Sequence, residues 1–235
     1  MYFKYKVAMA GFRFKQFSVE QELCAMKVGT DGCLLGAWVA CREDDIATVL
    51  DIGTGTGLIS LMMAQRFLKA RITAIDIDEG AVEQARINVE ASRFAERIEM
   101  RKSAVQDFSG KFDAIVSNPP YFVDALECPD SRRNMARHAN TLSYSELMHS
   151  AYRMLNDDGE FSVIIPADYR SKMEAEAAIA GFHQSRVCAV FTSMKRPAKR
   201  YMLAFKKRLV PVESTSLVID SDEFKTLLKD FYLKY

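Results

Sequence analysis

The stretch that decides the fold is residues 48–57, which read Thr-Val-Leu-Asp-Ile-Gly-Thr-Gly-Thr-Gly. A short apolar segment here runs into a loop with a glycine at every second position. Apolar residues resume from Leu58 to Phe67 and predict a helix directly after the loop. Glycines permit a tight turn and a close approach of the backbone to a ligand. The order strand, glycine loop, helix predicts a ligand-binding turn of an α/β fold.

Two acidic residues accompany the glycine loop. Asp51 precedes it, and Asp76 ends the next apolar segment, residues 71–76. Asp76 stands roughly 20 residues past the glycines, where nucleotide-binding folds place the carboxylate that binds ribose hydroxyls. The third glycine comes one residue too early for the dinucleotide fingerprint, and no lysine followed by serine or threonine completes a P-loop. The spacing therefore disfavours a nicotinamide-dependent dehydrogenase and excludes a P-loop nucleotidase.

Strands and helices alternate from residue 48 onward. Strand-like segments occur at residues 48–52, 71–76, 97–101, 112–116, 161–165, 186–192 and 201–206. Strands separated by helices predict a mostly parallel sheet covered on both faces. The last two strands are joined by about eight residues, which is too short for a crossover helix and predicts an antiparallel hairpin. We therefore predict an α/β fold with a seven-stranded, mostly parallel sheet, a terminal antiparallel hairpin strand and helices on both faces.

Helix caps and composition shifts suggest how the chain is divided. Ser18 and Gln21 resemble a capping box and predict a helix that ends near Met26, and Ser143 and Glu146 form a second box. We expect an N-terminal helical approach segment over residues 1–45 that packs on the core. The core itself spans residues 46–208, and a C-terminal tail with a short helix spans residues 209–235.

The glycine loop, with Asp51 before it and Asp76 after the next strand, resembles the class I S-adenosylmethionine-dependent methyltransferases over roughly residues 46–207. The resemblance implies a Rossmann-like class I methyltransferase fold, with Asp51 and the glycines at the methionine part of the cofactor. It also implies Asp76 at the ribose and Ile77 on one face of the adenine. That family often carries an acid after the third strand, but Ala104 stands there, so backbone groups of Ala104 and Val105, or the neighbouring Ser103 or Gln106, would have to replace it. The implied cofactor-binding residues of the core are Asp51, Gly53, Thr54, Gly55, Gly57, Asp76, Ile77, Ala104, Val105 and Asn118.

A second motif, Asn118-Pro119-Pro120-Tyr121, follows the strand predicted at residues 112–116. Its two prolines prevent continuation as an interior strand and stiffen the loop. The Asn118 side-chain oxygen and the Pro119 carbonyl could accept both protons of a planar amine and hold its nitrogen toward the transferred methyl group. Tyr121 or Phe122 could stack on the target ring. In methyltransferases this motif indicates an amino nitrogen as the target, in adenine, cytosine or the glutamine side chain of release factors.

Two blocks near the N-terminus, residues 12–19 and 26–38, resemble the bacterial tRNA1(Val) adenine N6-methyltransferase family, and Arg137-His138 also fits that family. The resemblance implies S-adenosylmethionine-dependent N6-methylation of the adenosine beside the anticodon of a tRNA. It also implies that Thr30 and Asp31 close over the methionine end of the cofactor. Release-factor glutamine methyltransferases carry a helical domain ahead of the glycine loop, and the roughly 45 residues available here are too few for one. That glutamine activity and a non-catalytic RNA-binding module remain the alternatives.

The charge of the chain is nearly balanced, with 32 Lys and Arg against 31 Asp and Glu. Attraction to RNA must therefore come from a local patch. Residues 186–208 carry basic side chains and no acidic ones. The candidate RNA-binding residues are Lys15, Arg137, Lys195, Arg196, Lys199 and Arg200.

The composition is that of a folded domain, with 235 residues of which 49% are hydrophobic and 27% charged. The longest apolar run has about eight residues, whereas a bilayer span needs about 18 to 20. The start of the chain lacks the apolar centre of a signal peptide. The five cysteines fall outside any C-x-x-C spacing, so neither a zinc site nor a redox pair is indicated. We expect a cytoplasmic protein without a metal or a membrane partner, and we favour a monomer.

Overall fold

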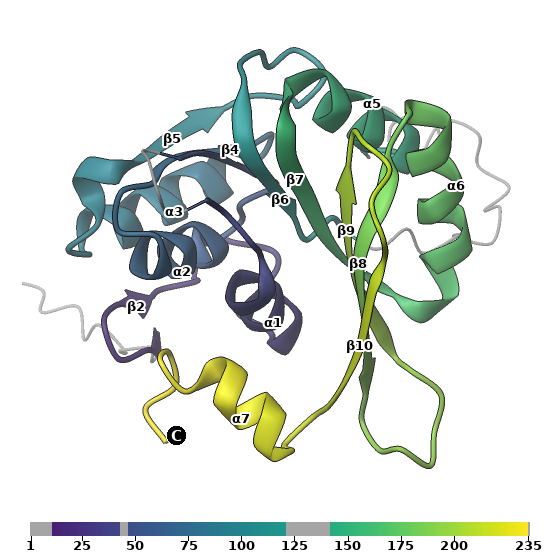
Figure 1. The fold of residues 1–235 in the computed structure, drawn as a ribbon. Coiled ribbons are helices and arrows are strands. Elements are labelled where there is room, and N and C mark those ends of the chain that lie inside the picture. The colour runs from purple at the N-terminus through teal and green to yellow at the C-terminus, as the bar shows by residue number, and fades with distance from the viewer. Residues whose placement is uncertain (1–10, 43–46, 121–141, 235) are drawn as a thin grey trace, which may run out of the picture.

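The computed structural model of the chain describes residues 11–42, 47–120 and 142–234. An eight-stranded sheet forms its centre, in the order β10-β8-β9-β7-β6-β3-β4-β5 (Figure 1). The strands are β3 (Thr48–Ile52), β4 (Arg71–Asp76), β5 (Ile98–Lys102), β6 (Phe112–Ser117), β7 (Leu155–Pro166), β8 (His183–Phe191), β9 (Arg200–Lys206) and β10 (Glu213–Val218). Neighbouring strands run parallel except where β9 pairs with β7 and β8. The predicted α/β sheet and its antiparallel hairpin are confirmed.

The sheet has eight strands and not the expected seven, because the C-terminal tail adds β10 as an outermost strand next to β8. This strand pairs in parallel with β8, from Glu213 opposite Arg186 to Val218 opposite Phe191. Its sequence is mostly polar and exposed, so the apolar pattern gave no signal for a strand. Backbone hydrogen bonds to β8 and the buried side chain of Leu217 hold it in place.

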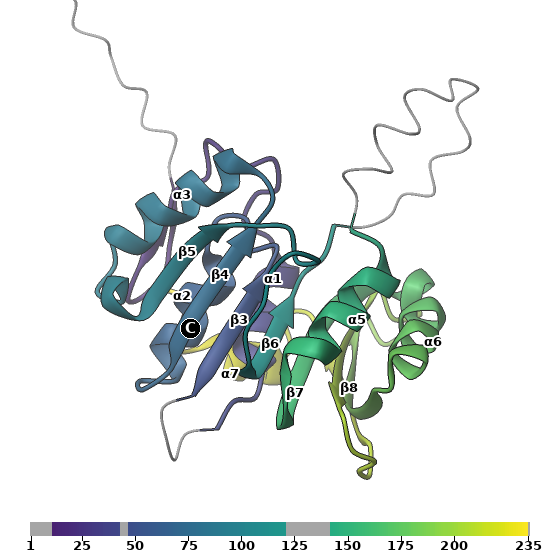
Figure 2. The ribbon, with the colours of Figure 1, turned by 90° about the horizontal axis from the view of Figure 1, so that it is seen from above.

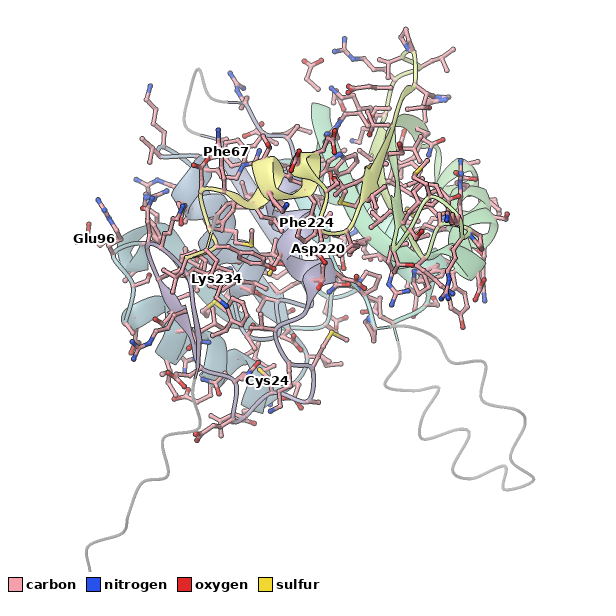
Figure 3. The ribbon with its side chains drawn as sticks, turned by 90° about the horizontal axis from the view of Figure 1, so that it is seen from below. Cys24, Phe67, Glu96, Asp220, Phe224 and Lys234 are labelled. Atoms are coloured by element: carbon pink, nitrogen blue, oxygen red, sulfur yellow. The ribbon has the colours of Figure 1, made fainter. Side chains whose placement is uncertain are left out.

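Helices cover both faces of the sheet, as predicted. They are α1 (Thr30–Trp38), α2 (Leu58–Arg66), α3 (Glu79–Glu90), α5 (Tyr144–Met154), α6 (Arg170–Ala180) and α7 (Asp222–Leu228). Successive side chains of a strand point to opposite faces, and β3 therefore sends Val49 into the core beneath α1 and α2 and Leu50 into the core beneath α5 and α6. Figure 2 shows α1 and α2 on one side of the sheet and α5 on the other. Phe224 of α7 is buried in the cluster that contains α1 and α2 (Figure 3).

The two predicted capping boxes have different outcomes. Ser143 does cap α5, because its side chain accepts from the Glu146 N–H and the Glu146 carboxylate accepts from the Ser143 N–H. The prediction of a helix beginning at Ser18 is wrong. Ser18–Val19 forms strand β2, which pairs with β1 (Phe12–Arg13) in a small hairpin. The backbone N–H groups that follow find acceptors outside the segment, with Asn88 Oδ1 accepting from Glu20 and Gln84 Oε1 accepting from Leu23.

The parallel strands place their carboxyl ends at one edge of the sheet. The glycine loop follows β3, Asp76 ends β4, residues 103–105 follow β5, and Asn118 follows β6. The antiparallel strand β9 starts at this same edge, with Arg200 paired opposite Pro166 at the end of β7. The loop at residues 192–199 therefore lies at the edge that carries the candidate site. No helix within the described ranges is long and apolar enough to cross a membrane.

Candidate cofactor and substrate site

The glycine loop adopts a backbone that requires glycine. Gly53, Gly55 and Gly57 have φ angles of 70°, 56° and 80°, in the left-handed region that side chains disfavour. A Cβ at Gly53 or Gly55 would meet no described atom within 4 Å, so the outer surface of the loop is open to a ligand. The Gly53 N–H donates to the Ile75 carbonyl at 2.9 Å, which fixes the loop to β4.

Asp51 organises the loop from beneath. Its carboxylate is fully buried, and Oδ2 accepts hydrogen bonds from the hydroxyls of Thr54 and Ser60, both at 2.7 Å. Burial raises the pKa of Asp51 to about 6, although the two hydroxyl bonds oppose that rise. The second oxygen, Oδ1, is buried and has no hydrogen-bond partner among the described residues.

Asp76 joins the glycine loop to the end of β4. Its Oδ2 accepts from the Gly55 N–H at 2.9 Å and its Oδ1 accepts from the Asp78 N–H at 3.0 Å. The next residue, Ile77, is 55% exposed, which leaves an apolar surface beside the carboxylate. This arrangement suits the predicted contacts with a ribose and with one face of a base.

The loop after β5 completes this part of the edge. Ser103 N–H donates to the Asp76 carbonyl at 2.9 Å, which brings the half-buried Ala104 beside the end of β4. Val105 is buried in the core. Arg153 of α5 donates from Nη2 to the Phe108 carbonyl at 2.8 Å and so holds this loop against the sheet.

Asn118 lies directly after β6 and borders a cavity of about 390 Å³. Its side-chain Oδ1 is buried without a hydrogen-bond partner among the described residues. A Cβ at Gly32 of α1 would lie 4.0 Å from Asn118 Nδ2 and 3.1 Å from Leu58 Cδ2, so α1 closely approaches both. Pro119 is buried and Pro120 exposed, whereas Tyr121 lies outside the described residues.

The cavity brings together predicted site residues from distant parts of the chain. Its lining comprises Met26, Lys27, Val28, Gly29, Thr30, Asp31, Gly32, Gly53, Thr54, Gly55, Thr56, Leu58, Ile59, Asn118 and Arg200. Asp76, Ile77, Ala104 and Val105 do not line it and lie along the same sheet edge. Among the residues described, no group of three or more His, Cys, Asp or Glu side chains could hold a metal ion.

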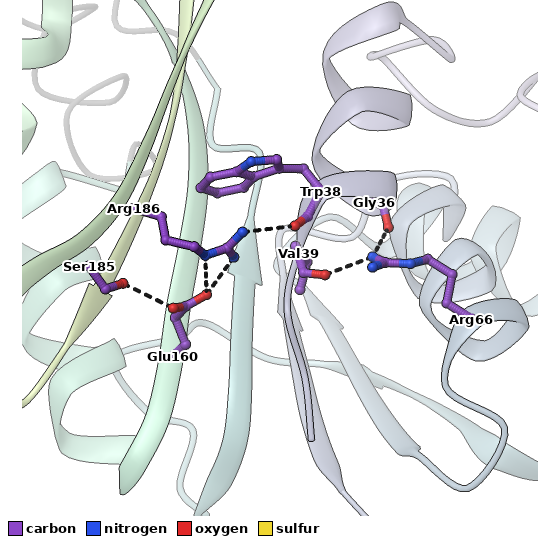
Figure 4. A network of polar contacts seen from close by, with 7 residues as sticks. All are labelled: Gly36, Trp38, Val39, Arg66, Glu160, Ser185 and Arg186. Carbon is purple, nitrogen blue, oxygen red and sulfur yellow. Dashed lines mark hydrogen bonds and ion pairs between the residues drawn. The ribbon is translucent and has the colours of Figure 1, made fainter. Parts of the chain in front are cut away.

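Polar contacts fix the C-terminal end of α1. At the C-terminal end, Arg66 donates to the carbonyls of Gly36 and Val39 at 3.0 and 2.7 Å (Figure 4). Arg186 donates to the Trp38 carbonyl at 3.3 Å and lies 4.0 Å from the centre of the Trp38 ring. These contacts anchor the helix whose first turn carries Thr30 and Asp31, which border the cavity together with the glycine loop.

Sequence reasoning missed these anchoring residues. Arg186 is itself held by Glu160, which accepts from its Nη2 at 2.5 Å and also accepts from the Ser185 hydroxyl at 3.0 Å (Figure 4). Arg186 and Trp38 lie 148 residues apart in the chain. No local pattern could have paired them, since an arginine in a strand gives no sign of the helix whose carbonyl it will bind.

The predicted RNA-binding residues fall into separate places. Lys195, Arg196 and Lys199 are exposed in the loop between β8 and β9, and none of the three pairs with an acid within the described ranges. Arg200 instead binds Asp31 through a 2.7 Å bond from Nε to Oδ2. Arg137 lies outside the described residues.

Lys15 does not join the cavity at Asn118. It follows β1, and its Nζ donates to the Lys229 carbonyl at 2.5 Å. It borders a second cavity with Gln65 and Arg66, at the end of α2 opposite to the glycine loop.

The site can take a ligand that donates hydrogen bonds. Two buried acceptors, Asp51 Oδ1 and Asn118 Oδ1, have no donor among the described residues. The open surface above Gly53 and Gly55 offers backbone for a ligand to lie along.

Comparison with known proteins identifies the class to which this fold and site belong. The methyltransferase small domain family matches residues 39–189, which contain the glycine loop, Asp76 and Asn118. The fold is similar to that of a predicted O-methyltransferase from Agrobacterium tumefaciens, with a TM-score of 0.69 at 17% identity over 86% of this chain and 96% of that protein. A ribosomal protein L11 methylase from Lactobacillus delbrueckii subsp. bulgaricus gives a TM-score of 0.52 at 22% identity, covering 76% and 77%. At these identities the likeness concerns the fold alone.

Curated relatives extend the match over nearly the whole chain. A tRNA1(Val) (adenine(37)-N6)-methyltransferase from Phocaeicola vulgatus is 49% identical over 94% of this chain and 97% of that protein. Proteins with the same name from Trichodesmium erythraeum and Vibrio campbellii are 42% and 39% identical, over 95% and 97% of this chain and 98% of each relative. The chain belongs to the methyltransferase small domain family and to the tRNA1(Val) (adenine(37)-N6)-methyltransferase family. The resemblance drawn from the two N-terminal blocks is confirmed.

Proposed function

We propose that this protein transfers a methyl group from S-adenosylmethionine to N6 of an adenosine in tRNA, with adenosine 37 of tRNA1(Val) as the target. The names of the relatives support the RNA and the base. The observation that carries the proposal is Asn118 Oδ1, a buried acceptor without a described partner on the wall of the cavity beside the glycine loop. The N–H group of an exocyclic amine can supply the hydrogen-bond donor that this acceptor lacks.

The cofactor would lie along the edge formed by the ends of β3, β4 and β5. Gly53, Gly55 and the adjoining cavity would hold its methionine part, and Asp76 its ribose hydroxyls. Ile77 and the backbone of Ala104 would border the adenine. When bound, S-adenosylmethionine supplies a methyl group on a positively charged sulfur, ready for attack by a nitrogen lone pair.

Asn118 and Pro119 would position the nitrogen that is methylated. The lone pair of an adenine amine is delocalised into the ring, so the free base is a weak nucleophile. Hydrogen bonds from its two protons to Asn118 Oδ1 and to the Pro119 carbonyl favour the pyramidal geometry in which that lone pair is available. The residues therefore contribute orientation and electrostatics, and the proton released on methylation passes to solvent.

The tRNA backbone would be held by Lys195, Arg196 and Lys199. These three exposed cations belong to the loop between β8 and β9, at the same sheet edge as Asn118. A base must leave its stack to reach a buried amide, and contacts to flanking phosphates hold the strand while it does. The near-neutral charge of the whole chain makes such a local patch necessary.

Transfer of label tests the proposal against the glutamine alternative. The protein is incubated with methyl-labelled S-adenosylmethionine, unmodified tRNA and a release factor, and RNA and protein are then separated. We expect label in the RNA only, recovered after digestion as N6-methyladenosine, and its loss with Asn118→Ala. Label in the release factor, or in a base other than adenine, would overturn the assignment.

A further inference from the structure

We propose that Asp31 and Arg200 together form the receptor for the α-amino-acid end of S-adenosylmethionine, with Arg200 holding its carboxylate and Asp31 its ammonium group. This inference rests on the proposed function, because it assigns two further side chains to the ligand of that site. The two residues are 169 positions apart in the chain and meet only in the folded structure.

The pair borders the cavity from two different elements. Asp31 lies in the first turn of α1, and Arg200 is the first residue of β9. Arg200 Nε donates to Asp31 Oδ2 at 2.7 Å, and Arg200 Nη1 donates to the Lys199 carbonyl at 2.9 Å. The side chains of Arg200 and Asp31 are 32% and 21% exposed, so water screens their charges only in part.

The charge pattern of the cavity wall matches a zwitterion. Apart from this pair, Lys27 is the one charged residue in the lining of the described cavity, and its Nζ donates to the carbonyls of Gln21 and Cys24. An α-amino acid carries one positive and one negative group on the same carbon. A guanidinium has five N–H donors and a carboxylate several lone pairs, so each member of the pair can bind its partner and one group of the ligand together.

Arg200 differs in its surroundings from the exposed cations before it in the chain. Lys195, Arg196 and Lys199 project from the loop, whereas Arg200 is half-buried and held by Asp31 on the cavity wall. A phosphate of the tRNA backbone would have to enter the cavity to reach Arg200, whereas the end of a ligand bound in the cavity lies beside it. The geometry therefore favours a cofactor carboxylate over an RNA phosphate as the ligand of Arg200.

The anchoring of α1 makes the receptor rigid. Arg66 and Arg186 bind the carbonyls at the C-terminal end of this nine-residue helix, so Asp31 at the other end has a fixed position (Figure 4). A rigid receptor fixes one end of the ligand. The sulfur of the bound cofactor is then held at a set distance from Asn118, and the pair acts as a positioning device as well as a binding one.

Three thioether ligands separate the two charges of the amino-acid end. S-adenosylhomocysteine has both groups, S-adenosyl-3-thiopropylamine lacks the carboxylate, and 5′-methylthioadenosine lacks both. Calorimetry of the full chain would give each dissociation constant for the wild type, Arg200→Met and Asp31→Asn. Arg208→Met is the matched control, because Arg208 is exposed beyond the far end of β9.

The wild type and the Arg208→Met control should bind S-adenosylhomocysteine at least about tenfold more tightly than the propylamine, and the propylamine more tightly than 5′-methylthioadenosine. Arg200→Met should abolish the preference for S-adenosylhomocysteine over the propylamine. Asp31→Asn should abolish the preference for the propylamine over 5′-methylthioadenosine. Affinity for 5′-methylthioadenosine should stay within about twofold in both variants, since that ligand reaches neither side chain.

Four results would overturn the inference. One is an Arg200→Met protein that still prefers the ligand with the carboxylate. A second is equal loss of all three ligands, which would show that the pair only supports the fold. A third is a loss of tRNA affinity in Arg200→Met with its ligand preferences intact, which would make Arg200 a phosphate contact. A fourth is a wild type that methylates adenosine yet binds the three thioethers equally, which would refute this inference alone. A wild type that neither methylates adenosine nor binds any of the three would refute the proposed function too.

Discussion

Asp51→Asn should stabilise the free protein at neutral pH. The carboxylate of Asp51 is fully buried, and its Oδ1 has no hydrogen-bond partner among the described residues. Burial raises its pKa from 3.8 to about 6, so the folded protein bears the cost of an ionised group that the unfolded chain ionises freely. Asparagine keeps the shape and still offers an oxygen to the hydroxyls of Thr54 and Ser60, but carries no charge.

The size of the gain follows from the pKa rise and depends on pH. Below pH 3.8 the carboxyl is protonated in both states and the substitution removes no ionisation cost. Between pH 3.8 and 6 the folded state holds more protons than the unfolded chain, so stability falls as pH rises. The expected gain in the free energy of unfolding is between about 1 and 2 kcal/mol at pH 5 and about 3 kcal/mol at pH 7.5 and above. These are upper values, because the new amide N–H₂ also needs an acceptor.

Urea unfolding followed by circular dichroism at pH 5 and pH 7.5 measures both quantities. Asp113→Asn is the control of opposite sign. Although burial raises the pKa of Asp113, hydrogen bonds from Thr48 and Asn156 lower it overall, so this variant should lose stability at pH 7.5. An Asp51→Asn protein that is less stable than the wild type at pH 7.5, or whose gain is the same at both pH values, would refute the reasoning.

Substitutions at three further places test separate parts of the site. Asp76→Ala removes charge-assisted bonds of about 1.5 to 3 kcal/mol each and should weaken S-adenosylmethionine binding at least tenfold by calorimetry; an unchanged constant would exclude Asp76 from the site. Asn118→Ala should lower turnover about 100-fold at nearly unchanged cofactor affinity, with partial activity in Asn118→Asp, and near-normal turnover in the alanine variant would contradict amine positioning. Replacing Lys195, Arg196 and Lys199 with Gln should weaken tRNA binding about tenfold and reduce the slope of log K against log salt by up to about 0.9 per lost phosphate contact; an unchanged slope would make this loop ordinary surface.

The parts of the site that follow strand ends could be predicted from the sequence. The glycine loop, Asp76 and Asn118 each come directly after an apolar segment, and parallel strands bring their carboxyl ends to one edge. The positions of these residues in the structure follow from that rule alone. The antiparallel hairpin of β8 and β9 could also be predicted, from a different rule, because the segment that joins them is too short for a crossover helix.

Features that depend on long-range contacts could not be predicted. Where a helix was expected after Ser18, the side-chain oxygens of Asn88 and Gln84 on α3 accept hydrogen bonds from the backbone of this segment. A capping pattern carries no information about such distant partners. The pairing of Asp31 with Arg200 joins residues 169 positions apart, so no local pattern could predict it. The sequence showed Arg200 only as one member of a basic run, for which RNA contacts were expected throughout. Strand β10 was missed because backbone pairing, not apolar burial, holds most of its length.

Methylation of defined transcripts tests the central claim most directly. Unmodified tRNA1(Val) and the same transcript with adenosine 37 changed to guanosine are incubated with the protein and S-adenosylmethionine, and their nucleosides are measured by mass spectrometry. We expect close to one N6-methyladenosine per molecule of the first transcript and none in the second. Equal N6-methyladenosine in both transcripts, or none in either, would contradict it.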